Sequence, residues 1–102
     1  MTTNRLQLSS LDGITVLSGE IDAETAPQVA ASLDECAPES QVRLDVSAVT
    51  FMDSSALRVL VAQHHRLEAA GGRLEIVQPS RPVTRLFEIT SLNDVFPVSG
   101  AD

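Results

Sequence analysis

The sequence predicts an α/β domain whose sheet has four to five mostly parallel strands, with an antiparallel hairpin at one edge and three or more helices. Segments in which apolar and polar residues alternate recur between segments in which apolar residues follow helical spacing. Strands joined through such helices pair in parallel by right-handed crossovers. The first two strand-like segments are separated only by Asp12-Gly13, a turn signal that predicts an antiparallel hairpin. With 102 residues, 43% of them hydrophobic, residues 1–102 are expected to form one domain around one core.

The first half of the chain predicts two strands, a helix and a third strand. Alternation predicts the first two strands over residues 5–10 and 14–18. Thr25-Ala26-Pro27-Gln28 has the pattern of a capping box with proline in the first turn, and it begins a helix that Pro38 bounds. Residues 41–46 alternate again and predict the third strand.

The second half predicts a long helix, a strand, a short helix and a last strand. Asp53 is the natural N-cap of the long helix, and Gly71-Gly72 end it. The fourth strand follows over residues 73–77. Pro82 begins the short helix, and residues 94–98 add an edge strand. The apolar stripe of the long helix is Leu57, Leu60, Val61 and Leu67, and that of the short helix is Val83, Leu86 and Phe87.

Charge and composition exclude several classes of function. The formal net charge is −7 and the chain has no lysine, only scattered arginines. Nucleic acid is therefore not expected as a direct partner, because neutralising phosphates requires clustered basic side chains. An arginine-bearing protein surface suits this charge better. No basic-then-apolar leader opens the chain and no apolar run approaches the ~20 residues that span a bilayer, so we expect a cytoplasmic protein without membrane insertion.

The single cysteine, Cys36, excludes an intramolecular disulfide framework. It continues an apolar line with Val29 and Leu33, so we expect a buried thiol.

The most informative segment places two serines directly after an acidic residue, where a loop turns into the long helix. The leading amides of a helix lack intrahelical partners, so an anion on Ser54 would be stabilised by roughly 0.3 to 1 kcal/mol. Glu20 and Asp22 follow the second strand, and Asp53 and Ser54 follow the third. Because the carboxyl ends of neighbouring parallel strands meet at one edge, we expect an acidic patch around the hydroxyls of Ser54 and Ser55. A purely structural cap and a solvated acidic loop are the alternatives.

An enzyme would need Ser54 as nucleophile with His64 or His65 as base. Both histidines lie near the middle of the long helix, about 15 Å from Ser54 along its axis, and no Gly-x-Ser-x-Gly elbow is present. Adjacent helical residues do not face each other, so the two histidines are not expected to hold a metal. We therefore expect no catalysis and no metal site, with one histidine partly buried and the other solvated.

Four separated segments, in this order, resemble the anti-sigma factor antagonists, small single-domain STAS proteins of bacteria. The similarity runs from about residue 6 to residue 98, nearly the whole chain, and implies a STAS-like fold. The segments are Leu17-Ser18-Gly19-Glu20-Ile21-Asp22 followed by Thr25-Ala26, Asp45-Val46-Ser47 leading through Val49-Thr50-Phe51-Met52-Asp53-Ser54-Ser55-Ala56-Leu57, Gly71-Gly72-Arg73-Leu74, and Arg85-Leu86-Phe87.

The resemblance implies regulation by partner switching. In that family a partner that is both anti-sigma factor and serine kinase phosphorylates the serine after the motif's aspartate, which is Ser54 here, with Ser55 the less favoured site. Unphosphorylated protein binds this kinase and releases a sigma factor, phosphorylation ends the complex, and a separate serine phosphatase restores activity. ATP belongs to the partner's site, and no cofactor is expected in this chain. By analogy Glu20 and Asp22 are partner contacts, and we expect Asp53, Ser55 and Arg58, which adjoin Ser54 on the helix, to contact the partner as well.

Other STAS-like domains serve as accessory subunits of lipid-transport ABC systems or as scaffolds of stress-signalling complexes, and they keep the aspartate and one hydroxyl residue. The paired serines and the lack of an extra domain favour the antagonist role. Many family members carry glycine where this chain has Ala56 and Arg58, and often where Ser91 stands. Alanine and arginine favour helix over glycine by up to about 1 kcal/mol, so we expect a firmer first turn, and the geometry of partner contact is left open.

Overall fold

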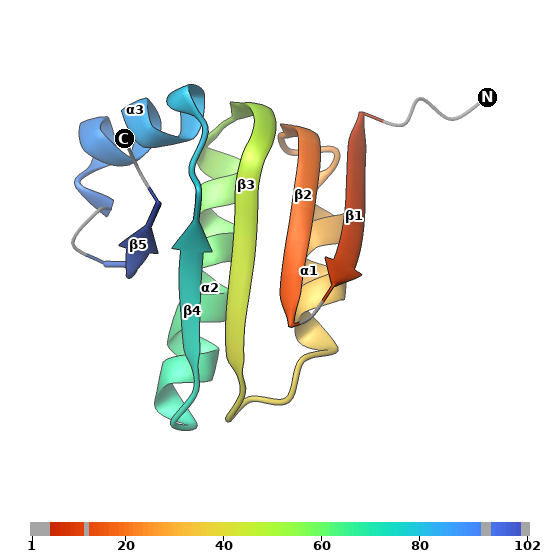
Figure 1. Ribbon diagram of the computed structural model, residues 1–102, viewed down its shortest axis with the longest axis vertical. Coiled ribbons are helices and arrows are strands. Elements are labelled where there is room, and N and C mark those ends of the chain that lie inside the picture. Colours follow the sequence, from red (N-terminus) through yellow and green to blue (C-terminus); the bar gives the residue numbers. More distant parts are fainter. Residues whose placement is uncertain (1–4, 12, 93–94, 101–102) are drawn as a thin grey trace.

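The computed structural model describes residues 5–11, 13–92 and 95–100, and it contains one five-stranded sheet in the order β1-β2-β3-β4-β5 (Figure 1). Strand β1 (Leu6–Leu11) pairs antiparallel with β2 (Ile14–Ile21). Strands β3 (Gln41–Met52), β4 (Arg73–Val77) and β5 (Val98–Ser99) continue the sheet in parallel. The predicted α/β class, with a mostly parallel sheet and an antiparallel edge hairpin, is confirmed.

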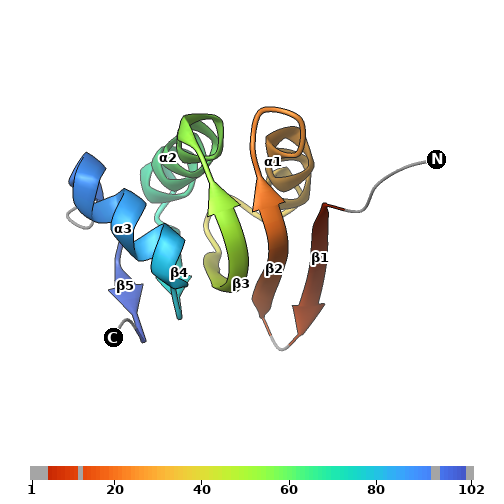
Figure 2. The ribbon, with the colours of Figure 1, turned by 90° about the horizontal axis from the view of Figure 1, so that it is seen from above.

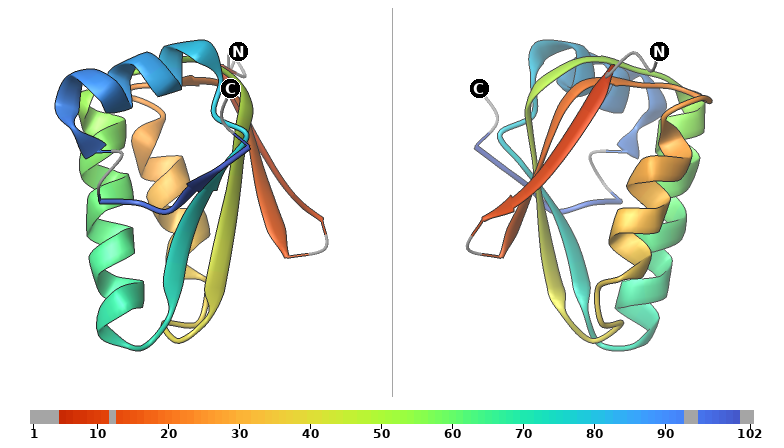
Figure 3. Two further views of the ribbon diagram at one scale, coloured as in Figure 1. Left: turned by 60° about the vertical axis from the view of Figure 1, so that its left-hand side comes forward. Right: turned by 90° about the vertical axis from the view of Figure 1, so that its right-hand side faces the viewer.

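Three helices complete the described part of the fold. Helices α1 (Ala26–Asp34) and α2 (Ser54–Ala69) lie side by side on one face of the sheet (Figure 2). Helix α3 (Arg81–Thr90) crosses the end of the sheet at which β3 finishes (Figure 3). None of the described helices is long and apolar enough to cross a membrane.

The core is aliphatic and fills the space between the sheet and its helices. Strands β2, β3 and β4 supply alternate side chains that are fully buried, as their predicted alternation requires. The apolar stripe of α2 packs against them, and α3 contributes the fully buried side chain of Phe87 to the same core. Its largest fully buried members include Leu17, Leu44, Leu60, Leu67, Leu74, Ile76 and Phe87.

Strand β3 is twice as long as predicted, because it continues past residue 46 to Met52. The side chain of Asp45 accepts hydrogen bonds from the amide and the hydroxyl of Ser47, at 2.9 and 2.7 Å, and the register between β2 and β3 shifts here and once more near Gly19. Such irregularities interrupt the period of two on which the sequence prediction depends. The extension matters for function because it carries β3 directly to Asp53.

Three local predictions are wrong. The predicted last strand, 94–98, is reduced to β5, because residues 95–96 form a turn and a bend and residue 94 lies outside the described residues, as does Asp12 of the predicted hairpin turn. The hydroxyl of Thr25 makes no capping bond to α1, so the capping box does not form. The thiol of Cys36 is half-exposed rather than buried, because the residue lies beyond the end of α1.

Candidate functional site

The two acidic loops do meet at one edge of the sheet. Ile21, the last residue of β2, pairs with Met52, the last residue of β3. The amide of Asp53 then donates to the carbonyl of Ile21 at 3.2 Å. Asp22 and Asp53 therefore leave the sheet from adjacent positions, as the parallel arrangement predicts.

Asp53 caps α2 as the sequence predicts. Its Oδ1 accepts from the amides of Ser55 and Ala56, at 2.9 and 3.3 Å, while its own backbone is extended. With the amide of Asp53 bound to Ile21, only the amide of Ser54 lacks a partner among the described groups of this helix start. A phosphate on Ser54 would therefore find most of the leading amides occupied.

The two serines differ in accessibility. Ser54 is exposed, whereas Ser55 is half-buried. Ala56 is buried in the core, so its methyl group cannot obstruct a partner. An enzyme that modifies this segment therefore reaches the hydroxyl of Ser54 more readily than that of Ser55.

The acidic loop after β2 is held by a cation that the sequence analysis missed. Strand β2 runs to Ile21, three residues further than predicted, so Glu20 lies near the end of the strand and only Asp22 and Glu24 lie in the loop itself. Arg5 donates from Nη1 to Glu20 and Asp22, at 2.8 and 2.5 Å, and from Nη2 to Asp22 and Glu24, at 3.1 and 3.0 Å. These hydrogen bonds raise the pKa of the guanidinium, that to Asp22 being the largest cause. One arginine thus serves three carboxylates, and a net negative charge remains on the loop.

Asp22 organises this loop rather than extending freely into solvent. Its Oδ1 accepts from the amides of Glu24 and Thr25, at 3.0 and 3.2 Å. The hydroxyl of Thr25 donates to the carbonyl of Glu20 at 2.8 Å and accepts from the amide of Asp22 at 3.0 Å. The Arg5 guanidinium, and then the amides of Thr25 and Glu24, hold the pKa of the Asp22 carboxyl well below its usual range against the opposing effect of desolvation. The loop therefore presents a fixed shape to a partner.

Gly19 makes the approach of Arg5 possible. Its φ is +112°, and a Cβ at this position would overlap the carbonyl oxygen of Arg5. That oxygen accepts from the amide of Glu20 at 2.7 Å. The sequence offered no signal for this contact, because it joins the start of β1 to residues that lie 14 and 15 positions later.

Arg58 shares a surface with Ser54. Both side chains are exposed and line one shallow hollow along the outer side of α2. Arg58 pairs with no carboxylate in the described part of the chain. The guanidinium is thus free to meet either a phosphate one turn away or a partner.

Neither histidine is placed to act on Ser54. His64 is buried against Phe96, with ring centroids 5.3 Å apart, and its Nδ1 has no described partner. His65 is exposed and lies eleven residues beyond Ser54, about 16 Å along α2. The predicted contrast between the two histidines is confirmed, but His64 is fully rather than partly buried. No group of three potential metal ligands occurs among the residues that the structure describes.

Comparison with known proteins agrees with this architecture. The STAS domain family matches residues 5–101 of the chain. The anti-sigma-B factor antagonist of Listeria monocytogenes is 34% identical over 88 residues, which cover 84% of this chain and 77% of that protein. The anti-sigma-B factor antagonist of Bacillus subtilis is 33% identical over 84 residues, covering 81% and 77%. The crystal structure of an anti-sigma factor antagonist from Mycobacterium paratuberculosis is 29% identical with a TM-score of 0.71, covering 91% of this chain and 82% of that one.

Proposed function

This chain belongs to the STAS domain family of anti-sigma factor antagonists, and we propose that it works by partner switching controlled through phosphorylation of Ser54. The unphosphorylated protein binds an anti-sigma factor that is also a serine kinase, and a sigma factor is released. The kinase then transfers the γ-phosphoryl group of its bound ATP to Oγ of Ser54, the hydroxyl proton is lost and ADP remains with the kinase. A serine phosphatase hydrolyses the phosphoester and returns the protein to its binding form. The proposal places this exchange in the bacterial cytoplasm.

One observation carries the proposal: Ser54, whose side chain is exposed, is the first residue of a capped helix and lies at the same sheet edge as an acidic loop of fixed shape. A phosphate adds about −1.5 to −2 charge at neutral pH. Like charges brought together at an interface cost several kcal/mol, and about 1.4 kcal/mol is tenfold in affinity. A single phosphate is therefore sufficient to reverse binding while the domain stays folded.

The remaining residues of the site have distinct roles in this proposal. Asp53 is a positioning residue, because its carboxylate fixes the start of α2 and hence the direction of Ser54. Glu20 and Asp22 present negative charge to an arginine-bearing partner, with Arg5 holding both in place. Ser55 and Arg58 lie on the surface that a partner covers when it reaches Ser54, and both are expected to touch it.

The test is incubation with the purified anti-sigma factor kinase of the same organism and ATP, followed by mass spectrometry of the peptide that contains Ser54. Ser54→Ala should abolish phosphorylation and keep binding, with little loss of stability because Asp53 remains the cap. Ser55→Ala is the matched control and should still be phosphorylated. Ser54→Asp should weaken binding incompletely, since one carboxylate carries less charge than a phosphate.

Phosphorylation of Ser54→Ala at the wild-type rate, with the phosphate on Ser55, would refute the site. Co-purification with a membrane ATPase in place of the kinase would instead support the role of a transporter accessory subunit.

A further inference from the structure

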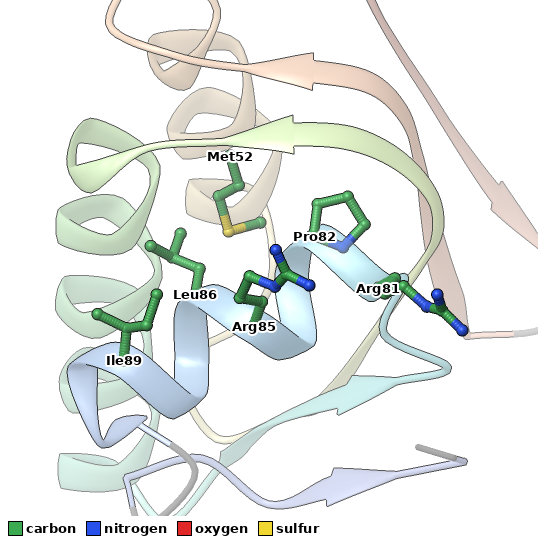
Figure 4. A pocket seen from close by; sticks show the side chains of 6 residues that line it. All are labelled: Met52, Arg81, Pro82, Arg85, Leu86 and Ile89. Atoms are coloured by element: carbon green, nitrogen blue, oxygen red, sulfur yellow. The ribbon is translucent and has the colours of Figure 1, made fainter.

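A second surface that the phosphorylation mechanism does not use lies on α3. Six residues from the end of β3 and the outer side of α3 surround a hollow of about 360 Å³ that opens to solvent (Figure 4). They are Met52, Arg81, Pro82, Arg85, Leu86 and Ile89. Met52 stands only two residues before Ser54, so a partner that reaches the hydroxyl of Ser54 also comes close to this hollow.

The hollow has an apolar end. The side chain of Met52 is buried at its base, Leu86 is half-buried and Ile89 is 74% exposed. A single exposed apolar side chain is common on proteins, but here the exposed Ile89 lines the same hollow as the half-buried Leu86 and the buried Met52. Contiguous apolar surface in a hollow is a feature of binding sites.

The hollow also has a basic end, which is unusual in a chain of net charge −7. Arg81 and Arg85 are exposed, and neither pairs with a carboxylate in the described part of the chain, whereas Arg5 and Arg43 do. In Figure 4 the guanidinium of Arg85 points toward Met52, while that of Arg81 extends away from the apolar end.

Local helix energetics disfavour both arginines where they stand. Arg81 is the first residue of α3, where the helix dipole favours an anion and repels a cation. Arg85 lies four residues later, so the two like charges repel each other along the helix surface. Residues that are unfavourable for their own helix, and that no other contact within the protein stabilises, are candidates for a functional role. Their charge is unmatched within the described chain and therefore available to a partner.

We propose that this hollow is a second docking point for the anti-sigma factor kinase, and that it takes an apolar side chain flanked by carboxylates. The inference rests on the proposed function, since it concerns the same partner. Residues 81–89 span about 12 Å along α3, which matches two turns of a partner helix or a short extended segment. The apolar side chain would enter between Leu86 and Ile89, and acidic side chains would reach Arg85 and Arg81.

Together with the loop held by Arg5, the hollow makes the binding surface bipolar. The loop after β2 is negative and attracts a basic region of the partner, whereas the hollow is positive and attracts an acidic one. A partner that matches both fits in one orientation only. That orientation is what a kinase needs in order to bring its bound ATP to one of two adjacent serines.

An anionic membrane is the main competing occupant, because arginines beside an exposed isoleucine also suit a lipid surface. The net charge of −7 opposes it, since the rest of the protein would be repelled by anionic headgroups. Charge complementarity therefore favours an acidic protein segment.

The test measures the affinity of the purified kinase for the full chain and for three variants. Arg85→Glu should weaken binding by at least about tenfold, and more strongly at low salt than at high salt. Ile89→Ser should weaken it several-fold with little salt dependence, because it removes apolar contact. Arg73→Glu is the matched control, because Arg73 is also exposed, also lacks a described carboxylate partner and lies at the opposite end of the sheet. The affinity of the kinase for this variant should stay within about twofold of that for the wild type. Melting curves check that all variants remain folded.

The outcomes are distinguishable. If the wild type binds the kinase and Arg85→Glu and Ile89→Ser bind as tightly as Arg73→Glu, the hollow is not a docking point and the proposed function stands. If the wild type does not bind the kinase at all, the proposed function fails and this inference fails with it. Sedimentation of the wild type with phosphatidylglycerol vesicles, lost in Arg85→Glu, would overturn the inference in favour of a lipid surface.

Discussion

Replacing Gly19 by alanine tests how the acidic loop is held in place. The φ of +112° at this residue is unfavourable for any residue with a Cβ, at a cost of roughly 1 to 2 kcal/mol. The new methyl group would also overlap the carbonyl oxygen of Arg5, so the start of β1 must move away. That movement breaks the 2.7 Å hydrogen bond from the amide of Glu20, worth about 1 kcal/mol. We expect Gly19→Ala to lower the free energy of unfolding by about 2 to 3 kcal/mol.

Gly13→Ala provides the control, because it shares the conformational cost without the contact. Gly13 has φ +79°, and a Cβ there meets nothing within 4 Å. Its substitution should cost only about 1 to 2 kcal/mol. Urea unfolding with linear extrapolation measures both variants, and their difference isolates the contact with Arg5. Equal losses of stability would refute the close approach of Arg5 to Gly19.

The structure supports three further predictions. Asp22→Ala should destabilise the protein at pH 7. Because folding lowers the pKa of this carboxyl, its stabilising contribution is fully present above about pH 4 and is lost as the pH falls through the folded pKa. The difference between wild type and variant in the free energy of unfolding, measured with urea, should therefore become steadily smaller from pH 5 to pH 2. If this difference does not change with pH, Asp22 is a solvated loop residue that does not pair with Arg5. Phosphorylation of Ser54 should stabilise the wild type by about 0.5 kcal/mol more than it stabilises the Arg58→Ala variant, as measured in a double-mutant cycle. If phosphorylation changes the free energy of unfolding of both proteins equally, Arg58 contacts the partner and not the phosphate. Ser91→Gly should raise the free energy of unfolding by up to about 1 kcal/mol, because Ser91 ends α3 at φ +60°, whereas Ser91→Ala should bring no such gain.

Sequence reasoning succeeded where the interaction is local. The cap of α2 could be predicted because it joins one side chain to amides two and three residues later. The glycine expected in relatives at position 91 also has a local reason, since the helix ends there in a left-handed conformation. The meeting of the two acidic loops followed from strand order alone, because parallel strands end at the same edge of a sheet.

It failed where two nearby residues compete for the same capping groups, and where an ion pair joins residues that are distant in sequence. The carboxylate of Asp22 accepts from the amide of Thr25, and the hydroxyl of Thr25 turns back to the carbonyl of Glu20, so the local capping pattern is overridden. Arg5 could not be assigned to the loop, because its ion pairs depend on the register of β1 against β2 and on the space beside Gly19. The acidic patch was therefore predicted at the right edge of the sheet but without the cation that shapes it.

The occupied cap decides how a phosphate on Ser54 would act. The carboxylate of Asp53 already holds the amides of Ser55 and Ala56, and displacing it would exchange one anion for another with little gain. The new charge would therefore not be absorbed by the helix start and would remain at the surface, with Arg58 as a partial counter-ion. A cap that left these amides free would draw the phosphate inward and weaken the signal. Asp53 thus favours switching by keeping the phosphate where an approaching partner must meet it.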